Sequence, residues 1–492
     1  MALNRLKQVL IREEVTPGVT VSPLSATYGK FYAIEPTCSR EVSRYERNFA
    51  RDSVTMPHAL LGTRRARLSF SLEMCGQAAT TPDVPAWDLA MRACGMRSAA
   101  TSYITTTAAG IAGSTGPLRH GETITQATTS ATAIVLHDTY PSGAITTVYV
   151  YNVVGSPNNS AVWTGGTSGA TFTPSVVPTD AGQSWWPISK HTSKLTYTTL
   201  TGSLPAGSVI KGNTSGAKAI VTSIDTTNKI IYFRYYSGTF TSTETVSLVS
   251  DPSNHNATNA ASIGQDDAPA VSCAIIEDGK VDVIYGARGN WRVNAKIGEP
   301  AVMSFELLGV LQSALTAADQ ALIASIAYDS KIPPVFMGST FRLGHEGDTT
   351  ISADYTPRIT SIGIDMGNEL YLRESAAASD GYEDCVITGR NVSGSFDPEL
   401  DLDASYPFFA DFQGTNTTNV PIGRCNFTVG SAAGNKFYVS MPGMQYDPPQ
   451  TQSRNGVLAY QIPFKATGGY LSTEVAQTIG ADNEFCVTYL LV

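Results

Sequence analysis

The chain has 492 residues, enough for several domains with sizeable cores. Charged residues make up only 15% of it, glycine and tyrosine are frequent (43 and 22), and the net charge is −9. This composition favours β-rich, turn-rich structure. It argues against a nucleic-acid binder that neutralises phosphates, because such a protein needs a basic face.

The N-terminal segment MALNRLKQVLIREE is interrupted by charge every few residues and has no apolar h-region, so no secretory signal is predicted. No apolar run approaches the length of a membrane span. The seven cysteines are scattered, odd in number and without CxxC, which favours thiols in a reducing cytoplasm over disulfides or a zinc site.

Five segments are expected along the chain. Residues 1–29 form an N-terminal arm that orders against a neighbouring subunit. Residues 30–104 and 271–335 form a first block, 336–470 form a second block, and 471–492 form a C-terminal arm. Residues 105–270 are an inserted β decoration with two small modules, near 105–185 and 195–262. The predicted fold class is mainly β.

The first block opens with a strand in which Leu68, Phe70 and Leu72 alternate with polar residues. A short amphipathic helix is predicted over Ala86–Cys94, with Pro85 in its first turn and Gly95 at the C′ position. A hairpin is predicted in Lys280–Val310, with Gly286-Ala287-Arg288-Gly289 as its turn. A connector helix is expected to start near Thr316.

The inserted region has little charge and repeats its own pattern. Gly121–Val135 and Gly207–Val221 share a strand, a Thr-Ser-Gly/Ala turn and a second strand, and Trp163–Phe172 is a partial third copy. Trp185-Trp186 lies between the two modules and predicts either packing between them or stacking against a glycan.

The second block repeats the order of the first. Val302–Leu307 is echoed by Val457–Ile462, about 155 residues later. Ser395-Phe396 takes the place of Ser69-Phe70, and a helix ending at Gly414 takes the place of the one ending at Gly95. Pro442-Gly443-Met444 stands where the first block has its GARG segment.

These features resemble the tail tube (major tail) proteins of long, non-contractile-tailed bacteriophages. The residues that carry the resemblance are Arg12–Gly18 (REEVTPG), Pro85-Ala86-Trp87 through Gly95, Gly286–Gly289 (GARG) and Met366–Glu369 (MGNE). The resemblance covers about residues 1–104 and 271–470.

The resemblance implies two tandem tail-tube-like sandwich or barrel-wall domains. Tube domains of this family close six to a ring around a DNA-sized channel, so a chain with two of them is expected to form a trimer with pseudo-sixfold symmetry. Rings would stack into a tube in the virion, assembled in the host cytoplasm. The expected partners are the chain itself and tail terminator, tape measure and distal tail proteins. DNA would pass through without specific binding.

Site residues follow from the alternation and the expected ring. The polar face of the repeated strand and an acidic stripe are expected to line the channel: Ser304, Glu306, Ala459, Gln461, Asp397 and Glu399. For the acidic stripe, a solvated loop or a hard-cation site is an alternative. Contacts between subunits are expected at Arg64, Arg288, Tyr489 and Leu490.

No catalytic, metal or cofactor site is predicted, because the sequence has no HExxH, GxxxxGK[ST] or GxSxG motif. A second hypothesis is a phage decoration or adhesin that binds host-surface glycans through residues 105–270.

Overall fold

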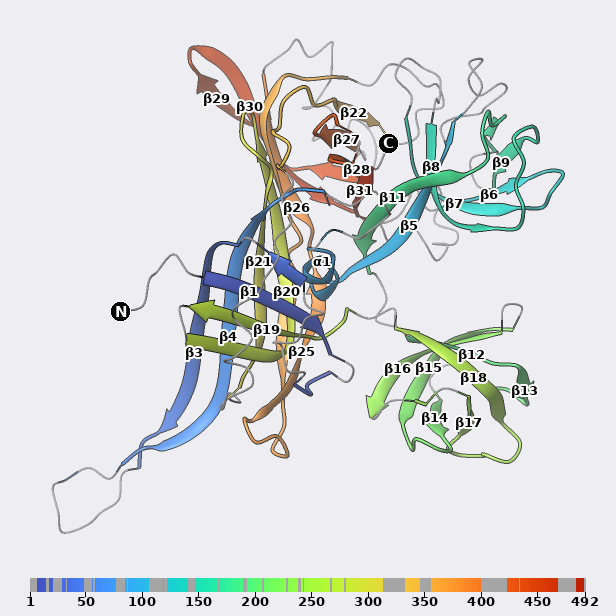
Figure 1. Ribbon diagram of the computed structural model, residues 1–492, viewed down its shortest axis with the longest axis vertical. Coiled ribbons are helices and arrows are strands. Elements are labelled where there is room, and N and C mark those ends of the chain that lie inside the picture. Colours follow the sequence, from blue (N-terminus) through green and yellow to red (C-terminus); the bar gives the residue numbers. More distant parts are fainter. Residues whose placement is uncertain are drawn as a thin grey trace.

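The computed structural model is almost entirely β, with multiple antiparallel sheets and one short helix among the described residues (Figure 1). The structure describes residues 7–14, 17–20, 29–31, 33–47, 55, 58–76, 85, 87–105, 118, 122–139, 147–166, 169–188, 193–205, 208–226, 229–237, 240–241, 243–265, 268–277, 280–312, 332–345, 355–399, 423–432, 434–467 and 484–490. The mainly β fold class is therefore confirmed. The described part of one chain forms no closed barrel.

Two sets of strands build most of the molecule, and we call them the first half and the second half. The first half contains β1 (Lys7–Glu13), β2 (Gly29–Phe31), β3 (Ile34–Tyr45), β4 (Leu60–Glu73), α1 (Asp88–Ala93), β19 (Val271–Glu277), β20 (Lys280–Lys296) and β21 (Val302–Leu311). The second half contains β22 (Phe341–His345), β23 (Ile359–Asp365), β24 (Asn368–Glu374), β25 (Tyr382–Arg390), β26 (Ser393–Pro398), β27 (Gly423–Val429), β28 (Lys436–Tyr446), β29 (Gln450–Arg454) and β30 (Val457–Ala466).

The two halves share one order of strand pairing. In the first half the strands pair in the order β1–β19–β20–β21–β4–β3, every pair antiparallel. In the second half the order is β22–β27–β28–β30–β26–β23, again antiparallel throughout. The same five pairings thus occur twice. The halves are joined edge to edge where the end of β20 pairs with β23.

The long strand β20 runs straight through the segment that was expected to be a turn. Its ladder with β19 pairs Ile284 with Cys273 and Ala287 with Val271, so Tyr285 and Gly286 form a bulge. The chain reverses later, between β20 and β21, and the prediction of a GARG turn is wrong. Gly286 has φ +60°, which serves a bulge as well as a turn.

A bulge of the same size occurs at the matching place in the second half. There Met441 pairs with Cys425 and Met444 with Gly423, so Pro442 and Gly443 are skipped. Gly443 therefore corresponds to Gly286.

The strand equivalence corrects the register of the predicted echo. Phe305 pairs with Phe70, and its ring stacks on that of Phe70 with centroids 5.3 Å apart. In the second half Phe396 pairs with Ile462. Phe305 therefore corresponds to Ile462, two positions beyond the predicted Tyr460. Leu458, which the predicted echo aligns with the buried Met303, is 51% exposed at the β29–β30 turn.

One hydrophobic core serves both halves. Residues of β4, α1, β20, β21, β23, β27, β28 and β30 all belong to a single buried cluster. The helix predicted over Ala86–Cys94 is present as α1, and it packs on β1, β5 and β20. The helix ending at Gly414 and the one starting near Thr316 lie outside the described residues.

The inserted residues form two modules with cores of their own. The first contains β5 (Met96–Thr105), β6 (Thr123–Gln126), β7 (Thr132–Thr139), β8 (Thr147–Val154), β9 (Trp163–Gly165), β10 (Thr171–Phe172) and β11 (Thr179–Pro187). The second is a seven-stranded sheet of β12 (Ser193–Thr196), β13 (Thr199–Thr201), β14 (Val209–Gly212), β15 (Lys218–Asp225), β16 (Ile230–Ser237), β17 (Glu244–Leu248) and β18 (Asn256–Gln265).

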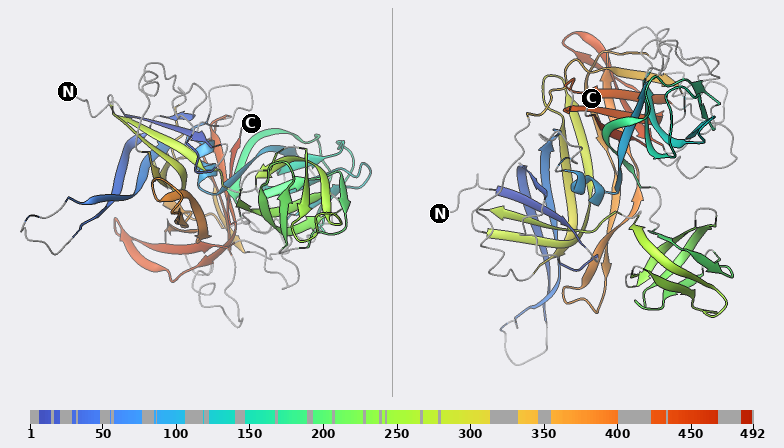
Figure 2. Two further views of the ribbon diagram at one scale, coloured as in Figure 1. Left: turned by 90° about the horizontal axis from the view of Figure 1, so that it is seen from below. Right: turned by 45° about the vertical axis from the view of Figure 1, so that its right-hand side comes forward.

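The second module stands apart from the rest of the chain in Figure 1 and in the right-hand view of Figure 2. Its first and last strands are neighbours, and Ser193 pairs with Gln265. The chain therefore enters and leaves this module at one place.

Both chain segments expected as arms contain strands of the main sheet. β1 lies between β2 and β19, and Val9, Leu10 and Ile11 are buried. β31 (Cys486–Leu490) lies between β28 and β11, with all five residues buried. Hydroxyl groups of Thr101, Ser184 and Thr488 form a buried line across β5, β11 and β31, with O···O distances of 2.6 and 2.7 Å. These strands are satisfied within the chain, which corrects the expectation of arms at these residues.

Candidate functional site

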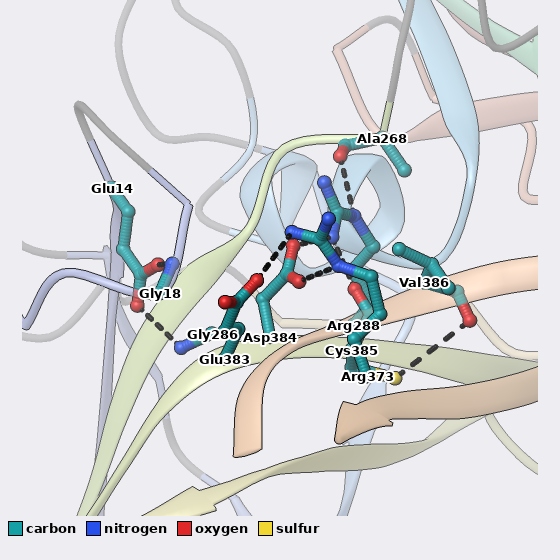
Figure 3. Close-up of polar contacts among 10 residues, drawn as sticks. All are labelled: Glu14, Gly18, Ala268, Gly286, Arg288, Arg373, Glu383, Asp384, Cys385 and Val386. Atoms are coloured by element: carbon teal, nitrogen blue, oxygen red, sulfur yellow. Dashed lines mark hydrogen bonds and ion pairs between the residues drawn. The ribbon is translucent and has the colours of Figure 1, made fainter. Parts of the chain in front are cut away.

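A buried cluster of charged side chains lies where the end of β1, the bulge of β20 and strand β25 meet (Figure 3). We call it the polar junction, and it consists of the buried side chains of Glu14, Arg288 and Asp384, the backbone of Gly286, and the half-exposed Arg373 of β24. Glu14, Arg288 and Asp384 are at most 6% exposed. Charged groups are rarely buried to this extent unless each one has partners, so the contacts of each decide what the junction does.

Glu14 closes the junction on the side of β1. One carboxylate oxygen accepts hydrogen bonds from the Gly286 amide and the Ser272 hydroxyl, both at 2.7 Å. The other accepts the Gly18 amide at 2.8 Å. The side chain thereby links the REEVTPG segment to the bulge of β20.

Arg288 and Arg373 hold Asp384 from two sides. Arg288 Nη1 lies 3.1 Å from Asp384 Oδ2 and also donates to the Cys385 carbonyl, while Arg288 Nε donates to the Ala268 carbonyl at 2.8 Å. Arg373 Nε donates to the other carboxylate oxygen of Asp384. A carboxylate with two guanidinium partners offsets the desolvation of the buried arginine.

Two glycines allow the backbones to approach this closely. Gly18 has φ +79°, and a Cβ added to it would lie 2.5 Å from the Glu383 carbonyl oxygen. A Cβ on Gly286 would lie 3.0 Å from the Asp384 Cα atom. A side chain at Gly18 would push β25 away from the segment after β1, and a side chain at Gly286 would push β25 away from β20.

A second polar contact joins the end of helix α1 to the same region. The Asn368 side-chain amide donates to the Cys94 carbonyl at 2.7 Å and to the Gly289 carbonyl at 2.9 Å. The residue before it, Gly367, has φ +60°, and Gly95 after the helix has φ +82°. All four segments that carry the resemblance therefore meet in one neighbourhood, although up to about 350 positions separate them.

The pH dependence of stability gives a test of the buried Glu14. Burial raises the pKa of the Glu14 carboxyl in the folded protein above the ordinary value of 4.5. At pH values between the ordinary pKa and this raised pKa, the folded state binds more protons than the unfolded state. The free energy of unfolding therefore falls as pH rises through that window. Replacing Glu14 with glutamine removes this titration, and the stability difference between the unmodified protein and the variant should shrink with rising pH.

Urea unfolding of both proteins in the same buffers measures this difference, because the contributions of the other carboxylates cancel. A difference that grows as pH rises would mean that the folded protein lowers the pKa of Glu14.

The contacts of the polar junction are those of a structural site that holds the end of β1, β20 and β25 together. A hollow of about 270 Å³ beside it is lined by Pro17, Gly18, Tyr285, Arg373 and Tyr382, among others, and the Tyr285 hydroxyl donates to Asp380 at 3.0 Å. Burial raises the pKa of the nearby Cys385 thiol to about 11, which keeps it protonated and poorly nucleophilic. Among the described residues no group of three or more His, Cys, Asp or Glu could hold a metal ion.

The residues expected to line a channel fall into two groups. Ser304, Glu306 and Gln461 lie on the outer face of their strands, where Ser304 bonds the Ser71 hydroxyl at 2.8 Å and Glu306 pairs with Arg67. Ala459 is fully buried, so its expected place in a channel wall is wrong.

The acidic stripe divides in the same way. Asp397 is 6% exposed and accepts the Thr360 and Ser361 amides at 2.9 and 2.7 Å, so it is a buried structural carboxylate and its expected channel position is wrong. Glu399 is partly exposed and lies 3.5 Å from Arg358. Asp401 and Asp403, which continue the alternating acidic residues after Glu399, lie outside the described residues.

Three of the four residues expected between subunits are occupied inside the chain. Arg288 is held by Asp384, and Tyr489 and Leu490 are 1% exposed in β31. These placements correct the prediction, because such side chains are not presented to another molecule. Arg64 is partly exposed and lies 3.6 Å from Asp380.

The tryptophan pair is also internal. The Trp185 ring lies 4.5 Å from that of Trp87, and its Nε1 donates to Asp88 at 2.6 Å. Trp186 is 4% exposed, and its ring lies 4.7 Å from that of Tyr151. The pair anchors β11 to the first half and the first module, and it packs neither between the two modules nor on the surface.

No sequence pattern predicts Asp384 and Arg373 as members of the polar junction. Both lie in a hairpin of ordinary charged alternation, and Asp384 is 96 positions from Arg288. The REEVTPG and GARG segments, which contain Glu14 and Arg288, are the sequence features that pointed here.

No protein-family model matches the chain, and a search of curated proteins finds no relative. No helix among the described residues is long and apolar enough to cross a membrane.

Proposed function

We propose that the protein is a structural subunit of a phage tail tube, in which three copies close into a ring and rings stack into a tube that conducts the genome. The observation that carries this proposal is the pairing order that occurs in both halves, five antiparallel pairings in each. Two equivalent halves side by side make each chain a third of a sixfold wall.

The way the halves are joined supports a wall. β20 and β23 pair over Arg292–Lys296 and Ser361–Asp365, so the sheet continues from one half to the other. An open sheet of this kind presents a strand at each end, which is an aggregation liability in a monomer and is satisfied when a ring closes.

The charge of the chain fits a passage for DNA. With a net charge of −9 and few basic residues, the protein would repel phosphates weakly rather than retain them. The proposal assigns no reaction to the protein. It places the protein in the virion, in contact with tail terminator, tape measure and distal tail proteins.

The glycan-binding alternative has lost its main support. It relied on Trp185-Trp186 together with Tyr232, Phe233, Tyr235 and Tyr236. Trp185, Trp186 and Phe233 are 0%, 4% and 0% exposed, and Tyr232 is half-buried. The side chains of Tyr235 and Tyr236 lie outside the described part of the structure.

Electron microscopy of the purified protein tests the proposal. Averaged images are expected to show threefold rings with six similar wall segments, alone or stacked. The matched variant replaces residues 193–265 with a short glycine-serine linker, which the neighbouring ends of this module permit. Because this module has its own core, the variant should form the same rings without one peripheral density per copy of the chain.

Monomers under all conditions would contradict the tube. True sixfold symmetry would mean that one of the two halves does not build the wall. Loss of rings only in the variant would place the second module in the ring rather than outside it.

A further inference from the structure

The pairing between the two halves provides a template for pairing between two copies. In the template, the end of β20 is bonded to β21 on one edge and to β23 on the other. The strand that takes this position in the second half is β29, which is bonded to β30 on one edge. Among the described strands, none is bonded to the other edge of β29.

The ladders establish this equivalence residue by residue. In the first half Arg292 pairs with Ser304 and Asn294 with Val302. In the second half Gln450 pairs with Gln461 and Gln452 with Ala459. Because Phe305 corresponds to Ile462, Ser304 corresponds to Gln461, and Gln450 therefore takes the place of Arg292.

The first half supplies the matching partner strand. β23 takes the place in the second half that β3 takes in the first, since β23 pairs with β26 as β3 pairs with β4. Phe70 and Phe396 are equivalent, which aligns Cys38 with Ile364. The burial agrees, because Cys38 and Ile364 both face the main core. The outer edge of β3 carries no described strand.

We infer that β3 of one copy pairs antiparallel with β29 of a second copy in the register of the β20–β23 ladder. The template pairs Val293 with Ile364, so Thr451 of one copy lies opposite Cys38 of the next. The same register places Arg454 opposite Glu35, which are oppositely charged. This inference rests on the proposed ring and specifies the strands that close it.

The surface of both strands is consistent with this partner. All residues of β29 except Arg454 are exposed, and most of Ile34–Tyr45 in β3 is exposed. Val457 and Leu458, beside β29, are about half exposed (50% and 51%). A second copy laid along β29 covers a polar strand edge and these two apolar side chains together.

The native Cys38 makes a direct test available. Opposite residues of antiparallel strands have Cα atoms about 4.5–5.5 Å apart, within the range of about 4.4–6.8 Å that a disulfide spans. Under mild oxidation, Thr451→Cys is expected to give covalently linked dimers and trimers in non-reducing gels, reversed by a thiol reductant. Adding Cys38→Ser should abolish them.

Register is tested by a neighbouring position. Gln452→Cys places its thiol on the opposite face of β29 from Cys38, so it should give roughly tenfold less linked product than Thr451→Cys. If Thr451→Cys does not fold, Gln450→Cys with Ser39→Cys in the Cys38→Ser protein tests the next pair of the same ladder.

The outcomes separate this inference from the proposed function. Rings in the microscope without cross-linking of Thr451→Cys overturn the β3–β29 pairing and leave the tube standing. Equal linkage from Gln452→Cys overturns the register. Neither rings nor cross-links would contradict both, whereas specific cross-links in open chains would support the pairing and contradict ring closure.

Discussion

Replacing Asp384 with alanine is expected to lower the free energy of unfolding by about 3–5 kcal/mol, the cost of breaking a buried ion pair by removing one partner. Asp384 is 2% exposed and is held by both Arg288 and Arg373. Without it, the buried guanidinium of Arg288 loses its counter-charge. Urea unfolding followed by tryptophan fluorescence measures the change. None of the five tryptophans lies in residues 193–265, so the signal reports the rest of the molecule.

A surface ion pair provides the matched control. Glu41 pairs with Arg65 at 2.6 Å, with both side chains more than 40% exposed. Glu41→Ala should therefore cost no more than about 1 kcal/mol. Asp384→Asn keeps the shape and removes the charge, and it should fall between the two. Equal losses from Asp384→Ala and Glu41→Ala would show that the polar junction contributes nothing beyond a surface contact.

Replacing Gly286 with alanine is expected to cost about 2–5 kcal/mol, from the left-handed backbone and from overpacking. Gly286 has φ +60°, and the new Cβ would lie 3.0 Å from the Asp384 Cα atom. The new Cβ lies on β20 and the Asp384 Cα atom lies on β25, and each strand is hydrogen-bonded to its own neighbours. Neither strand can therefore move without disturbing the polar junction. The same unfolding measurement applies.

The control is a glycine with the same backbone sign and open space around it. Gly298 has φ +78°, and nothing lies within 4 Å of an added Cβ. Gly298→Ala should lose only the backbone cost of about 1–2 kcal/mol. If the two variants lose equal stability, the close approach of β20 and β25 has no energetic weight.

Alternation predicted the faces of the strands but not their exact register. Phe70, Phe305 and Leu307 lie in the core as the pattern indicates. The echo was placed two residues early, at Tyr460 instead of Ile462. A shift of two keeps every side chain on its face, so a pattern of period two cannot detect it. The register follows from the pairing of Phe305 with Phe70 and of Ile462 with Phe396.

Strands buried on both faces were mistaken for arms. Val9, Leu10 and Ile11 form a continuous apolar run that is typical of a strand covered on both sides, as is the run in β31. Their position near the ends of the sequence favours arms, whereas the apolar run favours buried strands.

The partners of the polar junction could not be predicted from the sequence, for a different reason. Arg288 was recognised as part of a motif, but its partner Asp384 lies 96 positions away in a hairpin whose charges look solvated. A glycine in GARG is equally suitable for a turn or a bulge, because both use positive φ. Only the ladder with β19 separates the two readings.

The place of β31 has a consequence for synthesis on the ribosome. Ser184 and Thr488 are hydrogen-bonded neighbours but are 304 positions apart, so β11 is translated long before its partner strand. Contacts of such high sequence separation form slowly. Until then β11 and β28 each lack a neighbour, and open strand edges of this kind bind other chains. The nascent protein therefore has a long interval in which chaperones, rather than its own sheet, must keep these edges covered.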